Sequence, residues 1–158
     1  MTSTLLLEAL RETWFGVDLD PAVAERLVAC AHLQVLPPGR GLLREGGPSR
    51  ELGIVRSGRI ALKVHVPARG EVTILTVEPG DIVGWSAIVP PFRATSTAVT
   101  VDEVELLVFD GDGLRALLAE PAVASAVYPR VLAAVARRLA GTRQQLLDLL
   151  ASNGQETW

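Results

Sequence analysis

The stretch LPPGRGLLREGGPSRELGIVRSGRIAL (residues 36–62), followed a little later by VEPGDIVG (residues 77–84), decides the fold. Short runs of aliphatic residues are broken at close intervals by glycine, at positions 39, 46, 58, 80 and 84. Glycine is the residue that best tolerates a positive φ, so each of these positions predicts a sharp turn. The segments between these short strands are too short for the helices that would connect parallel strands. The pattern therefore predicts an antiparallel sandwich or roll.

Similar β-rich runs continue from residue 34 to residue 109, and RIALKVHV alternates with Ile60, Leu62, Val64 and Val66 on one face. Helical patterns flank this region. Residues 3–15 predict a first helix, and DLDPAVAERLVACAHLQ (residues 18–34) predicts a second, with Asp20 as its N-cap and Pro21 in its first turn. We therefore expect one domain: N-terminal helices (1–32), a β-roll (33–113), C-terminal helices (114–152) and a tail (153–158).

The C-terminal region reads as helical throughout. In FDGDGLRALLAE, Asp110 or Asp112 can cap the first helix, and the absence of later acidic ligands argues against a calcium loop. Pro129 predicts either a kink or the start of a new helix.

An apolar seam then begins at Tyr128 and steps by four and three residues through Leu132, Val135, Leu139, Thr142, Leu146 and Leu149. Two interpretations are open. The seam either packs along the β-roll of its own chain or pairs two copies in a two-fold coiled coil, which we favour.

Composition narrows the class of protein. The chain has 158 residues, of which 49% are hydrophobic, and a mean hydropathy of +0.32, so more apolar surface is expected than one small core can bury. The chain has a net charge of −3, whereas a nucleic-acid-binding domain usually has an excess of basic residues. Charged residues and prolines interrupt the apolar region 116–136, and the N-terminus does not resemble a leader peptide. We expect a cytoplasmic protein that does not enter a membrane.

The glycine-punctuated pattern resembles the cyclic nucleotide-binding domain of the catabolite activator/FNR superfamily, over residues 33–149. The resemblance implies a mainly β fold with flanking helices: a double-stranded β-helix, or jelly-roll-like β-roll, with a phosphate-binding cassette and a long C-terminal helix that commonly pairs two subunits. Family transcription factors continue into a helix-turn-helix. This chain ends at Trp158, so we expect a stand-alone form with no direct DNA binding.

The cassette-like loop is expected at residues 80–97, within the stretch GDIVGWSAIVPPFRATSTAV (residues 80–99). In family members that bind nucleotide, the cassette begins Gly-Glu, and the glutamate accepts a hydrogen bond from the ribose 2′-hydroxyl. An arginine followed by a small hydroxyl residue then holds the cyclic phosphate. Here Gly84 keeps the glycine position, but Trp85 replaces the glutamate. The resemblance suggests as ligand-binding candidates Gly84, Trp85, Ser86, Arg93, Ala94 and Thr95.

Two of these candidates have alternative interpretations. Arg93 lies nine residues after Gly84, and is either an anion contact or a surface arginine. Trp85 either stacks on a ring of the ligand or fills the space that a ribose needs, and we favour a plugged or reshaped pocket. Cyclic AMP (cAMP) and cyclic GMP (cGMP) stay candidate ligands, as does another small phosphorylated molecule, but the missing ribose acceptor argues against the cyclic nucleotides.

Nothing in the sequence indicates catalysis or a metal site. His32, expected at a helix end, and His65, expected on a strand, have no paired nucleophile, and the single cysteine, Cys30, predicts neither a disulfide nor an iron–sulfur cluster. We therefore expect a non-enzymatic regulatory or sensor domain with a degenerate ligand pocket. The alternative is an accessory subunit that binds a protein partner. Because GWS with VPPFR resembles short bacterial members encoded beside redox enzymes, a hydrogenase complex is one candidate partner.

Overall fold

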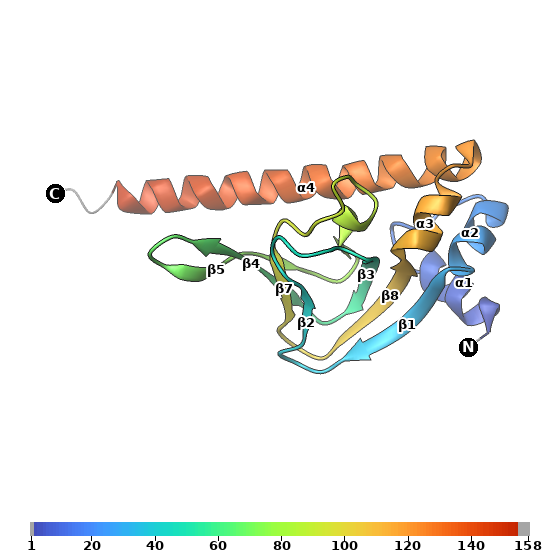
Figure 1. Cartoon of the computed structure of the whole chain (residues 1–158), viewed down its shortest axis with the longest axis horizontal. Helices are drawn as coiled ribbons and strands as arrows, with labels where there is room; N and C mark the ends of the chain where they lie inside the picture. Colours follow the sequence, from blue (N-terminus) through green and yellow to red (C-terminus); the bar gives the residue numbers. More distant parts are fainter. Residues whose placement is uncertain (1, 155–158) are drawn as a thin grey trace.

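The computed structural model describes residues 2–154 and has the expected mainly β architecture (Figure 1). Two N-terminal helices, α1 (Ser3–Arg11) and α2 (Pro21–Val28), precede eight strands and a short 3₁₀ turn, η1 (Trp85–Ala87). Two helices follow the strands, α3 (Gly111–Leu117) and the long α4 (Pro121–Asn153). None of the described helices combines the length and the apolar character needed to span a membrane.

The strands form two antiparallel four-stranded sheets. The first sheet has the order β1 (Ala31–Leu36), β8 (Val104–Asp110), β3 (Glu51–Ser57) and β6 (Ile82–Val83). The second has the order β2 (Gly41–Leu43), β7 (Thr97–Thr100), β4 (Ile60–Val66) and β5 (Gly70–Val77). The antiparallel roll predicted from the glycine spacing is therefore confirmed.

The five glycines that predicted turns all have a positive φ, between 79° and 93°. Gly84 shows why the side chain must be absent: a Cβ atom there would lie 2.2 Å from the carbonyl oxygen of Glu51. The close approach brings the first turn of the cassette against β3, so the cassette begins at a fixed point of the sheet.

The hydrophobic core has two parts, separated by the first sheet. β8 shows the division, because Leu106 and Val108 face the second sheet whereas Leu107 and Phe109 face the helices. The helix-side part also receives buried residues of α4, namely Val123, Val127, Val131 and Ala134. This stripe holds the N-terminal half of α4 against the body, and the C-terminal half extends beside the β4–β5 hairpin (Figure 1).

Helix limits differ from the sequence-based expectation at two places. Asp20 does cap α2, accepting a hydrogen bond from the Ala22 amide, but α2 ends at Val28 and His32 lies in β1, paired with Val108. The ladder to β8 overrides the helical pattern there. Pro129 lies inside an unbroken α4, so the expected start of a new helix at this proline is wrong.

Candidate functional site

The cassette candidates separate into different environments. Gly84 caps η1 in the left-handed conformation, and its carbonyl accepts a hydrogen bond from the Ala87 amide at 3.0 Å. Ser86 and Ala94 are buried, with 5% and 4% of their surface exposed. Trp85 and Thr95 line a common cavity, whereas Gly84 lines a second one. The neighbouring residues Gly84 and Trp85 thus line two different cavities.

The cavity beside Trp85 has a volume of about 240 Å³, which is smaller than the roughly 300–1,000 Å³ of drug-sized ligand pockets. It lies between the cassette, the β4–β5 hairpin and α4. Its apolar wall is formed by Leu62, Ile74, Leu75, Val135 and Leu139. Its polar groups come from Thr95, Ser96, Arg138 and Thr142.

Arg93 lies away from this cavity. Its guanidinium Nη1 donates a hydrogen bond to the carbonyl of Gly46 at 2.9 Å, its backbone forms an isolated bridge with Pro48, and the residue is exposed. Arg93 therefore does not line the Trp85 cavity, whereas Thr95 and Ser96 do, and a role for Arg93 as an anion contact stays a prediction.

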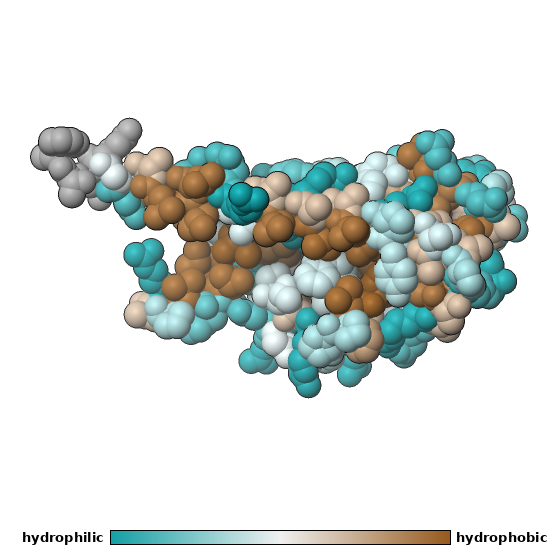
Figure 2. Space-filling view, turned by 90° about the horizontal axis from the view of Figure 1, so that it is seen from above, coloured by the Kyte–Doolittle hydropathy of each residue, from teal (hydrophilic) through white to brown (hydrophobic). Residues whose placement is uncertain are grey.

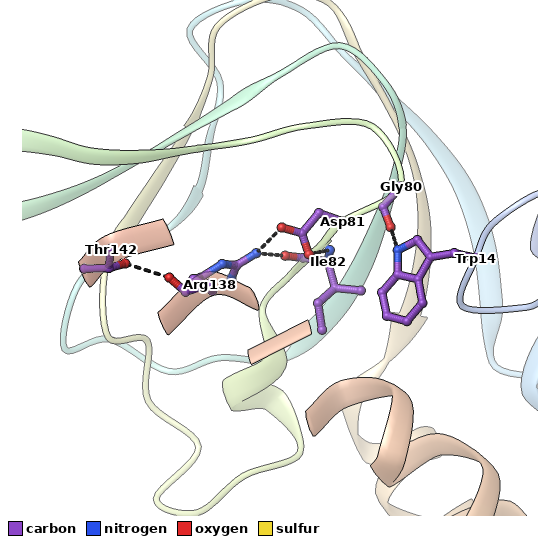
Figure 3. Close-up of polar contacts among 6 residues, drawn as sticks. All are labelled: Trp14, Gly80, Asp81, Ile82, Arg138 and Thr142. Atoms are coloured by element: carbon purple, nitrogen blue, oxygen red, sulfur yellow. Dashed lines mark hydrogen bonds and ion pairs between the residues drawn. The ribbon is translucent and has the colours of Figure 1, made fainter. Parts of the chain in front are cut away.

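Arg138 of α4 is the cationic residue among those that line the Trp85 cavity, and it is not among the candidates predicted from the sequence. Its side chain is only 14% exposed, and its Nη2 donates to the Asp81 carboxylate at 3.2 Å and to the Ile82 carbonyl (Figure 3). Its Nε is buried and has no hydrogen-bond partner among the described residues. A signal was available in the sequence: Arg138 continues the stripe of buried residues that includes Val131 and Ala134, at helical spacing.

The turn that carries Asp81 is also held from the N-terminal side. The Trp14 indole N–H donates a hydrogen bond to the Gly80 carbonyl (Figure 3). The Arg137 guanidinium lies 4.1 Å from the centre of the Trp14 ring. The turn before β6 therefore links the segment after α1 to α4, next to the cavity.

The predicted seam on α4 lies at the surface of the chain. Leu132, Leu139 and Leu146 are 69%, 60% and 57% exposed, and only Val135 is half-buried. Figure 2 shows hydrophobic side chains gathered along α4 toward its C-terminal end, where Leu147, Leu149 and Leu150 are also exposed. The buried stripe that holds α4 against the body is a different one, but the seam residues Val135, Leu139 and Thr142 line the cavity beside the β-roll, so pairing of two copies through the seam stays a prediction.

Residues 2–154 contain no group of three or more His, Cys, Asp and Glu that could hold a metal ion. Cys30 is half-buried with its thiol near the Leu27 carbonyl, at 3.3 Å, and burial together with the nearby Asp110 charge raises the pKa of this thiol. A protonated thiol is a poor nucleophile.

Comparison with known proteins agrees with this architecture. The model of the family described as "Cyclic nucleotide-binding domain" matches residues 33–121, so the chain belongs to that family. A CRP-like cAMP-activated global transcriptional regulator of Mycobacterium tuberculosis is 34% identical over 143 residues, which cover 90% of this chain and 62% of that protein. The chain thus spans about three fifths of that relative's length.

Solved structures share the fold. A putative cyclic nucleotide-binding protein from Geobacter metallireducens superposes with a TM-score of 0.75 at 25% identity, over 84% of this chain and 96% of that one. A cyclic nucleotide-binding domain from Methylobacillus flagellatus gives a TM-score of 0.77 at 22% identity, over 92% and 83% of the two chains. The β-roll with a long C-terminal helix is therefore the family's fold.

Proposed function

We propose that this chain is a regulatory domain whose family-type cavity no longer takes a cyclic nucleotide. The observation that carries the proposal is the lining of the Trp85 cavity. The resemblance aligns Trp85 with the glutamate that accepts from the ribose, and an indole donates a hydrogen bond and accepts none. The cavity that Trp85 lines receives Thr95 and Ser96 from the cassette, whereas Arg93 contacts Gly46 and does not line it.

The expected output of such a domain is a change in how α4 associates. We include in the proposal that two copies pair through the α4 seam, because its leucines are exposed and repeat at the heptad spacing of a coiled coil. The cavity is lined by seam residues as well, Val135 and Leu139, so its contents lie next to the proposed dimer contact.

A second candidate function is docking of a protein partner on the same helix. The exposed leucines extend beyond the seam to Leu147 and Leu150, which widens the apolar face past what one heptad seam uses. A redox enzyme complex such as a hydrogenase stays the candidate partner suggested by the sequence. A protein that is monomeric alone and forms a stoichiometric complex when co-purified would favour this function over the homodimer.

Thermal unfolding tests the ligand part of the proposal. A ligand present at 100 times its Kd stabilises the folded state by about 2.7 kcal/mol, which would raise the Tm of a domain of this size by roughly 5–11 °C. We expect 1 mM cAMP or cGMP to leave the Tm unchanged within error. A concentration-dependent rise that is lost in Arg138→Gln and kept in Arg93→Gln would show instead that the cavity binds nucleotide.

A further inference from the structure

The Trp85 cavity combines an apolar interior with one positive charge. Among the described residues that line it, Arg138 is the only cationic one, and the rest are aliphatic, aromatic or hydroxyl-bearing. Such a surface suits a molecule with an apolar body and one acidic group. A second charged group would lose its hydration against aliphatic side chains, which offer it no hydrogen bonds.

The hydrogen bonding of Arg138 is incomplete. Nη2 already contacts the Asp81 carboxylate and the Ile82 carbonyl, but the buried Nε has no acceptor among residues 2–154. Buried donors without a partner are rare in folded proteins, and each one calls for an explanation such as an absent ligand. Because protein atoms cover Nε, a carboxylate could accept from the guanidinium through two parallel hydrogen bonds, one of them from Nε, only after Arg138 turns away from Asp81 toward the cavity.

Charge and size define the ligand further. Asp81 partly neutralises Arg138, so the cavity cannot balance a dianion, which excludes a phosphate monoester in favour of a monoanion. An apolar cavity of about 150 Å³ holds benzene. The 240 Å³ here therefore suits a benzene-sized or short aliphatic body plus a carboxylate, whereas a cyclic nucleotide is several times larger than benzene.

We infer that the cavity between the cassette, β5 and α4 binds a small monocarboxylic acid with an apolar body. Arg138 holds the carboxylate, and Trp85 with Leu62 and Leu75 covers the body. This inference rests on the proposed function, since a nucleotide in the same cavity would exclude the acid. The ligand competes with Asp81 for the guanidinium, so binding changes the contact between α4 and the turn before β6.

Calorimetric titration of the full chain at pH 7 tests the inference with two monoanions and their neutral isosteres, phenylacetate against phenylacetamide and hexanoate against hexanamide. At least one acid should bind roughly tenfold to a hundredfold more tightly than its amide, because the hydrogen bond involves a charged donor and acceptor. Arg138→Gln should abolish that preference. Arg137→Gln, which removes the neighbouring charge stacked on Trp14, should preserve it.

Asp81→Asn distinguishes a binding role of Arg138 from a purely structural salt bridge. Removing the competing carboxylate should tighten binding of the acid about fivefold, and a gain in affinity cannot arise from misfolding. Absence of any acid preference in the wild-type protein, or weaker binding in Asp81→Asn, would overturn the inference. Saturable binding of cAMP in the same titration series would contradict the proposed function itself, so the two failures are distinguishable.

Discussion

Gly84→Ala is expected to destabilise the folded protein by about 3 kcal/mol or more, lowering its Tm by roughly 6–12 °C. Two effects add. The φ of +80° is unfavourable for any residue with a Cβ atom, and the new atom would lie 2.2 Å from the Glu51 carbonyl oxygen. The backbone of β3 or of the cassette must then move. Denaturant and thermal unfolding monitored by circular dichroism measure the loss.

Gly39→Ala is the matched control for this substitution. Gly39 has the same φ of +80°, but a Cβ atom there would meet nothing within 4 Å. Its replacement carries only the backbone strain, about 1 kcal/mol. Equal losses in the two variants would show that Gly84 does not lie against β3, and the description of the cassette's starting point would be incorrect.

Replacement of both Leu139 and Leu146 by glutamate should convert a dimer into a monomer at micromolar concentration. Each leucine that is buried in the proposed contact contributes about 1.5–3 kcal/mol, and a two-fold axis counts each residue twice. Like charges would also face each other across the axis. Light scattering coupled to size exclusion should report twice the 16.8 kDa chain mass for the wild type and the single mass for the variant.

Ala133→Glu is the control on the same helix. Ala133 is exposed and lies at a helical position away from both the seam and the buried stripe, so the dimer should persist. A wild-type protein that is already monomeric at these concentrations would remove the homodimer from the proposal and leave the partner-docking function.

Local backbone chemistry explains why the fold could be predicted and the site only in part. The turns at residues 39, 46, 58, 80 and 84 have a positive φ, which glycine adopts more easily than other residues. The spacing of these glycines therefore identifies the roll. The heptad spacing of the seam on α4 is likewise visible in the sequence, but the exposure of its leucines is not. The tryptophan at position 85, where nucleotide-binding family members have a glutamate, can be recognised from the sequence without knowledge of the tertiary structure.

Side-chain direction needed the structure. Arg93 and Thr95 lie two residues apart in an irregular loop, where no helix or strand period says which one turns toward the cavity. In the structure Arg93 is exposed and its Nη1 donates to the Gly46 carbonyl, whereas Thr95 lines the cavity. Arg138 resembled three other arginines of α4, and only the packing of Val131 and Ala134 against the body shows that it continues the buried stripe.

The central claim is that an indole and a helix arginine have replaced the nucleotide-binding groups of this cavity. Native mass spectrometry of the protein purified from its own cells, without added ligand, tests it most directly. The account predicts that no cyclic nucleotide accompanies the protein, and that any bound species released on denaturation is a small acid. A stoichiometric cyclic nucleotide, retained by the wild type and lost from Arg138→Gln, would contradict it.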